Sequence, residues 1–381
     1  MEKLNATVVI WGNDNYNVLG LLRELVPYVE EVITLIHKKE TGEATKSIYC
    51  GQYIIVQSYE DGIEQLKKIG NTLIRDGFVI TTNDVLAEYV DQNYDELSKY
   101  YHLTGTTKQG LLTKIQSKVE MCKLAKDIGM TEPNTFMLDA NTNLDEIECP
   151  ILIKPDQKSK VKVGHNRFHT FSNKEELKIF QKSLGEGVSY NAQMYVEREE
   201  EYLMYGCRMA NGDLVIPGAI IKDRWHHGRV VRRIPPTVDI SLMLKFLERI
   251  GFYGLFSFEY GLMKGKAYFF EVNLRNDGTS LYYYLSGANM PLLWISSFFN
   301  KQDEVSRKVT KENVFIDGIG DFSKVLDGSI CFKKWRDDVK NATIYRYYDK
   351  SDKKPFLYAA MHTFPYQLLL LLAGRYRKRK K

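Results

Sequence analysis

The chain has 381 residues, of which 44% are hydrophobic and 27% charged, a balance typical of globular proteins large enough for two or three domains. Its five cysteines are an odd number without a CxxC pair, which argues against a disulfide framework or a zinc site and favours the cytoplasm. The net charge of +5 lies at one end, because the last seven residues, RYRKRKK, hold six basic groups. The rest is close to neutral, so no nucleic-acid-binding face is expected.

Residues 1–115 are expected to form an α/β domain. An apolar run, Ala6–Trp11, follows the N-terminus without a signal peptide, and a turn then leads into a helical pattern. Further strands are predicted at Glu31–Ile36, Tyr53–Val56 and Phe78–Thr81, and helices near Ile63–Ile69 and Glu88–Tyr100. This alternation predicts a parallel sheet with helices on both faces. Ligands of such sheets bind beyond the carboxyl ends of strands, which makes Asn13–Tyr16 and Thr81–Asp84 a candidate substrate rim.

Residues 116–192 are expected to form a small lobe. The segment Ser117–Gly129 reads as a helix, with Ser117 as its cap, and Lys118 in its first turn is free to reach a ligand. A short strand, Ile151–Lys154, precedes a polar loop, Asp156–Phe168, which carries three lysines. A further helix is predicted at Lys174–Ser183.

Residues 193–300 are expected to form a second lobe, which holds the metal and the substrate. Its acidic turn, Glu197–Glu201, leads into a hairpin with strands Tyr202–Met209 and Leu214–Ile221, because Asn211-Gly212 is a strong hairpin signal. A run of basic residues and a helix, Ser241–Ile250, follow.

The segment Phe256–Ser280 carries the clearest chemical signal. It reads as two aromatic-rich strands that turn around Lys264 and Gly265, which places Glu259 opposite or diagonal to Glu271 on one face. Two acids on an edge strand are often only solvated. Here Asn273 adds an oxygen on the same face, and two carboxylates with an amide oxygen are ligands that Mg²⁺ accepts together with substrate phosphates. The segment therefore predicts a magnesium–nucleotide site.

Taken in order, these features resemble the ATP-grasp superfamily across about two thirds of the chain. The segments WGNDNYNVLGLLREL and SKVEMCKLAKDIGMTEPNTF are most similar to its carboxylate–amine ligase branch, which includes bacterial D-aspartate ligases. The resemblance implies an N-terminal parallel-sheet domain followed by a two-lobed ATP-grasp domain of the α+β type. It also implies an ADP-forming ligase that makes a carbon–nitrogen bond through an acyl phosphate.

The resemblance further implies a role for individual residues. ATP phosphates would be held by Lys118 and Lys154, adenine by Tyr195 and Val196, and ribose by Glu201, with Glu199 and Glu200 as alternatives. The metal, Mg²⁺ or Mn²⁺, would be held by Glu259, Glu271 and Asn273. Developing charge would be stabilised by Arg275, and by Arg233 or its neighbour Arg232. The loop Asp156–Phe168 departs from the family, since it contains one glycine, Gly164, where the superfamily usually has several.

Residues 301–363 are expected to form a C-terminal extension, and residues 364–381 an apolar and basic tail. Five leucines, Leu368–Leu372, are too few to span a bilayer, so the tail either packs on the protein or anchors it to an anionic membrane surface. An anchor would suit a cytoplasmic ligase that attaches an amino acid to a cell-wall or surface-polysaccharide precursor. The competing interpretations are a non-catalytic nucleotide-binding adaptor at the membrane surface and an ATP-grasp enzyme that uses bicarbonate or ammonia. The carboxylate, the amine and the oligomeric state do not follow from the sequence.

Overall fold

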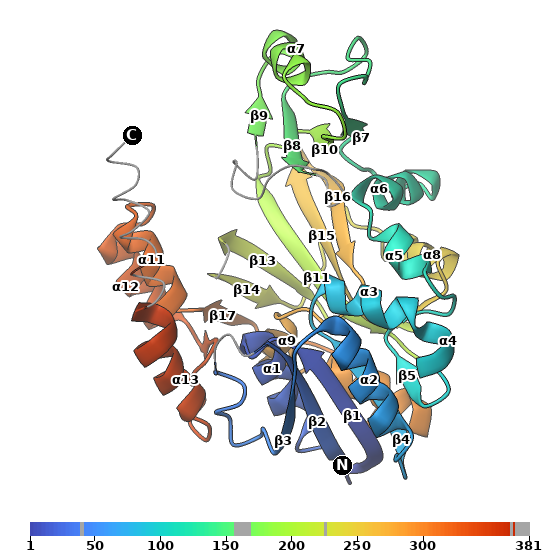
Figure 1. The fold of residues 1–381 in the computed structure, drawn as a ribbon. Coiled ribbons are helices and arrows are strands. Elements are labelled where there is room, and N and C mark those ends of the chain that lie inside the picture. Colours follow the sequence, from blue (N-terminus) through green and yellow to red (C-terminus); the bar gives the residue numbers. More distant parts are fainter. Residues whose placement is uncertain (39–41, 156–168, 225–226, 366–368, 370–381) are drawn as a thin grey trace.

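The computed structural model describes residues 1–38, 42–155, 169–224, 227–365 and 369, and Figure 1 shows how their helices and strands are arranged. The polar loop predicted at Asp156–Phe168 lies outside the described residues, as does most of the tail.

The N-terminal part folds into a parallel five-stranded sheet in the order β3-β2-β1-β4-β5. On one face of β1, Val8 and Ile10 pack with α1, and on the other face Val9 and Trp11 pack with α2 and α3. Because both faces of the sheet are covered, the central strand reads as a continuous apolar run. The predicted parallel sheet with helices on both faces is confirmed. The bounds are Leu4–Gly12 for β1, Tyr16–Leu25 for α1, Val29–His37 for β2, Gln52–Val56 for β3, Tyr59–Gly70 for α2, Asp76–Thr81 for β4, Asp84–Gln92 for α3, Tyr94–Leu97 for α4 and Tyr101–Leu103 for β5.

The single helix predicted near Glu88–Tyr100 is wrong, because two helices occupy this region. The first, α3, begins earlier, where the Asn83 side chain accepts a hydrogen bond from the Leu86 amide at 3.0 Å. Asn93 separates it from α4, and its side chain donates to the Tyr89 carbonyl at 2.9 Å, a local bond that competes with helix continuation. The early start matters for the site, since it places Asp84 at the carboxyl end of β4.

The small lobe is a four-stranded antiparallel sheet, β7-β10-β8-β9, with its own apolar core beneath α7. Helix α6 ends at Asp127, two residues before the predicted Gly129, whose φ of 96° suits a glycine that follows a helix. The predicted cap is wrong, because the Ser117 side chain makes no capping hydrogen bond, and its amide is still bonded to Lys114 of the preceding helix. The bounds are Gly105–Thr106 for β6, Leu111–Ile115 for α5, Lys118–Asp127 for α6, Thr135–Leu138 for β7, Ile151–Pro155 for β8, His169–Phe171 for β9, Lys174–Lys182 for α7 and Tyr190–Met194 for β10.

The largest sheet has the order β16-β15-β11-β13-β14-β17-β18, with β12 paired to β11 and β6 paired to β15. The second strand of the predicted Asn211-Gly212 hairpin is interrupted between β12 and β13, where Pro217 has no amide hydrogen to donate. The bounds are Glu200–Arg208 for β11, Leu214–Val215 for β12, Ala219–Arg224 for β13, His227–Val231 for β14, Ile240–Arg249 for α8, Phe252–Met263 for β15, Lys266–Asn273 for β16, Ser280–Leu285 for α9 and Met290–Ser296 for α10.

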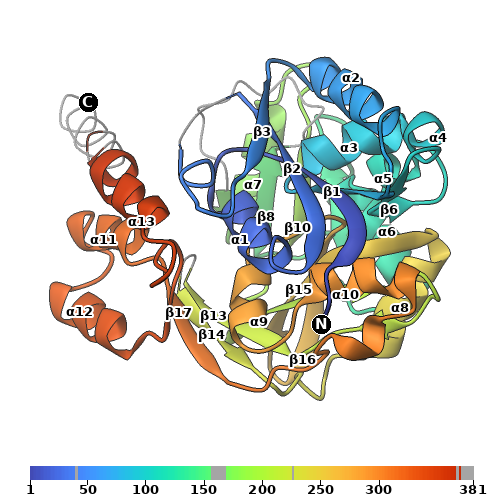
Figure 2. The same ribbon diagram turned by 90° about the horizontal axis from the view of Figure 1, so that it is seen from below.

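The C-terminal extension adds strands to this same sheet. Strand β17 pairs antiparallel with β14, and β18 pairs parallel with β17. Figures 1 and 2 show the helices α11, α12 and α13 grouped at one side of the molecule, next to β17. Among the described residues, no helix is long and apolar enough to cross a membrane. The bounds are Ser297–Phe299 for η1, Gln302–Glu304 for η2, Asn313–Ile316 for β17, Ile319–Leu326 for α11, Phe332–Asn341 for α12, Ile344–Tyr345 for β18, Lys354–Tyr358 for α13 and Ala359–Thr363 for the π-helical turn η3.

Candidate active site

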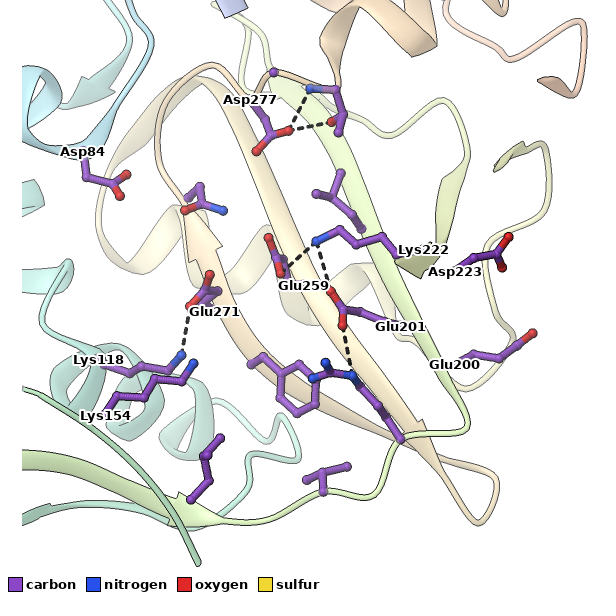
Figure 3. Close-up of a pocket in the computed structure, with 18 of the residues that line it drawn as sticks. Asp84, Lys118, Lys154, Glu200, Glu201, Lys222, Asp223, Glu259, Glu271 and Asp277 are labelled. Carbon is purple, nitrogen blue, oxygen red and sulfur yellow. Dashed lines mark hydrogen bonds and ion pairs between the residues drawn. The ribbon is translucent and has the colours of Figure 1, made fainter. Parts of the chain in front are cut away.

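A cavity of about 1030 Å³ collects side chains from the N-terminal sheet, the small lobe and the large sheet. The charged residues labelled in Figure 3 converge from α3, α6, β8, β11, β13, β15 and β16 and from the loop after β16. Nine of the ten predicted site residues line it, all except Arg233: Lys118, Lys154, Tyr195, Val196, Glu201, Glu259, Glu271, Asn273 and Arg275.

The hairpin of β15 and β16 has the predicted register. Lys264 and Gly265 have φ of 51° and 71°, which closes a tight turn, and Glu259 lies directly opposite Glu271. Each carboxylate has its own lysine: Lys118 Nζ is 2.8 Å from Glu271 Oε2, and Lys222 Nζ is 3.1 Å from Glu259 Oε2. The repulsion expected between two facing acids is therefore balanced by two cations from neighbouring elements, as Figure 3 shows.

The two lysines of the small lobe have opposite pKa shifts. Burial alone would raise the pKa of Glu271, but Lys118 and Lys154 outweigh it and bring the pKa to about 2. Burial lowers the pKa of Lys118, whereas its ion pair with Glu271 more than restores it, so the pKa is raised. Burial and the neighbouring Lys118 lower the pKa of Lys154 to about 8. A second lysine held beside the first in this way is suited to an additional anion such as a phosphate.

Lys222 was not singled out from the sequence, although it lies at the centre of the charged wall. Its Nζ is 3.1 Å from Glu201 Oε1 and 3.1 Å from Glu259 Oε2. Burial lowers the pKa of Lys222, but Glu259 and Glu201 outweigh burial and raise it. The sequence signal that could have identified Lys222 is a lysine directly after an apolar strand. Its bridge between Glu201 and Glu259, however, depends on β11 lying between β13 and β15.

The glutamates of the acidic turn contact different partners. Glu199 accepts a hydrogen bond from the Lys264 amide at 3.0 Å, and Glu200 accepts one from Tyr202. Glu201 pairs with Lys222 and, at 3.0 Å, with Arg198. All three acids line the cavity. The contact with Lys222 makes Glu201 the acid that belongs to the same charged network as the hairpin.

Arg275 is held by a ring of acceptors that line the cavity. Its Nε lies 3.0 Å from Asp84, Nη1 lies 3.3 Å from Asp277, and Nη2 donates to Asn273 Oδ1 at 3.1 Å. Burial raises the pKa of Asp277, but Arg275 outweighs it and the pKa is lowered. Asp84 comes from the predicted substrate rim, whereas Asp277 was missed as a partner of Arg275. The predicted Arg233 is exposed and is not among the residues that line the cavity.

The donor set suits a hard cation only together with other ligands. Among the residues that the structure describes, no three His, Cys, Asp or Glu side chains are grouped so as to hold a metal ion. Glu259, Glu271 and Asn273 offer carboxylate and amide oxygens on neighbouring strands, which are the atoms that Mg²⁺ prefers. Because Lys118 and Lys222 already bond these carboxylates, an ion there would share them with the lysines.

This architecture is that of the ATP-grasp fold, and several solved structures share it. The N5-carboxyaminoimidazole synthetase of Staphylococcus aureus superposes with a TM-score of 0.67 over 88% of this chain and 87% of its own, at 12% identity. The L-amino acid ligase of Bacillus licheniformis gives a TM-score of 0.61 over 82% and 80%, at 13% identity. The N5-carboxyaminoimidazole synthase of Aspergillus clavatus, in complex with ADP and 5-aminoimidazole ribonucleotide, gives 0.62 over 81% of each chain, at 12% identity.

At sequence identities this low, the structural similarity establishes the fold alone. The expected N-terminal parallel-sheet domain followed by a two-lobed ATP-grasp domain is confirmed. No protein-family model and no curated protein sequence matches the chain.

Proposed function

We propose that the protein is an ATP-dependent carboxylate–amine ligase that works through an acyl phosphate and releases ADP. The observation that carries this proposal is the charged wall of the cavity, where Glu271 pairs with Lys118 and Glu259 pairs with Lys222. Acids that served only to solvate an edge strand would not need buried lysine partners from two other elements. The three solved structures described above are synthetases or a ligase by name, and one of the three holds ADP, which supports a nucleotide at this wall.

In the proposed complex, the small lobe binds the nucleotide phosphates. Lys154 and Lys118 lie side by side in Figure 3 and neutralise phosphate oxygens without a covalent nucleophile. The Tyr195 amide donates to the Pro150 carbonyl at 2.8 Å, which holds the linker that is proposed to contact adenine. Glu201 is the proposed acceptor for the ribose hydroxyls.

A divalent cation fits the proposal as a partner of the nucleotide. Mg²⁺, or Mn²⁺ in its place, would be held by Glu259, Glu271 and Asn273 and would neutralise charge on the phosphates. The chain's own contribution is to keep the two carboxylates facing each other across the strands.

The proposed reaction has two steps. A substrate carboxylate oxygen attacks the γ-phosphorus of ATP, the bond to the bridging oxygen breaks, and ADP leaves. The amine nitrogen then attacks the acyl carbon, the carbon–oxygen bond to phosphate breaks, and the amine loses a proton to solvent. Arg275, charged and fixed by Asp84 and Asp277, is placed to stabilise negative charge on the acyl phosphate.

A screen of carboxylates and amines for phosphate release from ATP tests the proposal. We expect release only when one acid and one amine are present together, and an amide product detected by mass spectrometry. Release that requires bicarbonate or ammonia instead of an organic amine would favour that alternative. Nucleotide binding without turnover in any pair would favour a non-catalytic adaptor and contradict the ligase.

We further propose that the tail, residues 364–381, binds an anionic membrane surface and brings the cytoplasmic enzyme to a lipid-linked cell-wall or surface-polysaccharide precursor. Residues 319–381 hold fifteen lysines and arginines against six acids. The described part also exposes Phe332, Leu357, Met361 and Leu369. Apolar side chains beside basic ones are the composition that anionic bilayers attract. Co-sedimentation with phosphatidylserine vesicles should be lost when residues 365–381 are deleted, and unchanged binding would contradict the anchor.

A further inference from the structure

An arginine from the C-terminal extension lines the cavity and has no part in the mechanism above. Arg346 follows β18 and is 6% exposed, and it reaches the same cavity as Tyr16, Asn17 and Gly278. None of the sequence patterns linked the C-terminal extension to the site. The question is what a buried guanidinium does there.

Arg346 is fixed on three sides. Its Nε donates to the Tyr282 hydroxyl at 3.1 Å, its Nη1 lies 3.2 Å from Asp317 Oδ2, and its guanidinium carbon lies 4.1 Å from the centre of the Tyr16 ring. The other oxygen of Asp317 accepts from the Gly320 amide at 3.1 Å, so this carboxylate is fixed as well. The second terminal nitrogen, Nη2, has no hydrogen-bond partner among the described residues. Because a buried guanidinium normally satisfies its donors, Nη2 is the atom left for a ligand in the cavity.

Helix α1 adds a second source of positive potential at the same place. Tyr16 and Asn17 are its first residues, and its first turn contains no acid, so its N-terminal partial charge is not compensated within the helix. The nearest preceding acid, Asp14, is 1% exposed and accepts hydrogen bonds from Thr45 at 3.0 and 2.7 Å.

Gly278 keeps this arrangement in place. A Cβ at this position would lie 2.3 Å from Cε2 of Tyr16, so only glycine allows the loop after β16 to approach the ring. The ring is thereby held between this loop and the Arg346 guanidinium. The site is built from three distant parts of the chain rather than from one mobile surface residue.

We propose that Arg346 Nη2 and the first turn of α1 bind an anionic group of the substrate, either a carboxylate or a phosphate. This inference rests on the proposed ligase function. The bonded partners of Arg346, Tyr282 and Asp317, are not those of Lys118 or Arg275, so we assign its anion to a group other than the ATP phosphates and the carboxylate that is activated. The ligase therefore acts on a substrate with a second negative group.

Calorimetric titration of the full chain with inorganic phosphate and with succinate tests this site. A non-hydrolysable ATP analogue with Mg²⁺ is kept at saturation, so that the lysines of the nucleotide wall are already engaged. The test variant combines Arg346→Met with Asp317→Asn, because removing the arginine alone would leave a buried carboxylate unpaired. The control is Asp317→Asn alone, which keeps Arg346.

We expect the wild type to bind one of the two probes, and the double variant to bind it about 10- to 100-fold more weakly, the size of a charge-assisted hydrogen bond. The control should stay within about threefold of the wild type. The stronger probe identifies the group as a phosphate or a carboxylate. Equal binding by the double variant and the wild type, or no binding of either probe by the wild type, would overturn the proposal.

Two further measurements separate this inference from the proposed function. If the ATP analogue does not bind at all, the ligase proposal fails, and the same titrations without nucleotide still compare the variants at Arg346. If the double variant does not give the wild-type circular dichroism spectrum, Arg346→Lys replaces it. Lysine keeps the charge beside Asp317 but has no second terminal nitrogen, so we expect about tenfold weaker binding.

Discussion

The two charged walls of the cavity differ in how their residues are brought together. On the hairpin wall, Glu259 and Glu271 face each other across a single tight turn. On the wall of the proposed anion site, Arg346 lies over Tyr16, which is separated from it by most of the chain. Local strand pairing is therefore enough to bring the two carboxylates together, whereas Arg346 reaches Tyr16 only when the complete tertiary structure has formed. Substitutions that destabilise the fold should therefore disrupt the second wall, whereas substitutions on the first wall should mainly change the catalytic rate.

The largest effect should come from the ion pair that joins α1 to the C-terminal extension. Asp352 is fully buried, lies 3.0 Å from Arg23 and accepts from Ser47 at 2.7 Å. Asp352→Ala leaves Arg23 buried without its partner, so we expect the free energy of unfolding to fall by about 3–5 kcal/mol in urea denaturation. The matched control is Asp303→Ala, whose carboxylate is 88% exposed beside Arg307 and should cost less than about 1 kcal/mol. Equal losses would show that the C-terminal contact does not hold the second wall.

On the hairpin wall, Glu271→Gln should affect chemistry instead of stability. The amide keeps the shape of the side chain but no longer balances Lys118 and Lys154, and it is a poorer ligand for a divalent cation. We expect kcat for ATP turnover to fall by about 10²–10³-fold, as when one electrostatic contact to the transition state is removed. Glu64→Gln, at a side chain that is 59% exposed, is the control and should leave kcat unchanged. Full activity of Glu271→Gln in a phosphate-release assay would remove the hairpin from the mechanism.

Lys222→Met tests the residue that joins the acidic turn to the hairpin. Without the lysine, Glu201 and Glu259 lose a shared cation, and their mutual repulsion should disturb the proposed ribose and metal contacts. We expect KM for ATP to rise about tenfold or more, with a smaller change in kcat. The control is Lys67→Met, a surface lysine that also bridges two acids, Glu64 and Glu96. If the two variants behave alike, the bridge at Lys222 has no role in nucleotide binding.

The same contrast explains which features the sequence predicted. The strand alternation of the N-terminal domain and the pairing of Glu259 with Glu271 depend on residues that are close in sequence, and both predictions are confirmed. The predicted bounds of one helix, Glu88–Tyr100, were less reliable, because local hydrogen bonds of Asn93 divide this segment into two helices.

Contacts between distant strands were not predictable from one sequence. The bridge by Lys222 requires the order of three strands, and the position of Arg346 requires β18 to join a sheet that begins in another domain. Arg233 was assigned a role from its charge alone. In the structure its side chain is exposed and does not line the cavity, and this position depends on where β14 ends. A charged residue can be assigned to a site only when the element that carries it is placed.

The last prediction separates Lys154 from Lys118 on the small lobe. Burial and Lys118 bring the pKa of Lys154 to about 8, so its charge is present below this pH and lost above it, whereas the raised pKa of Lys118 keeps that lysine charged. If ADP phosphates bind the charged form, affinity should fall about tenfold from pH 7 to pH 9, as the protonated fraction falls from roughly 0.9 to 0.1. Lys154→Arg keeps its charge throughout this range, so its calorimetric affinity for ADP should not change with pH. At pH 8 the wild type should also take up a proton on binding, seen as a binding enthalpy that depends on the buffer, and the arginine variant should not. An equal pH dependence in both proteins would place the titrating group elsewhere.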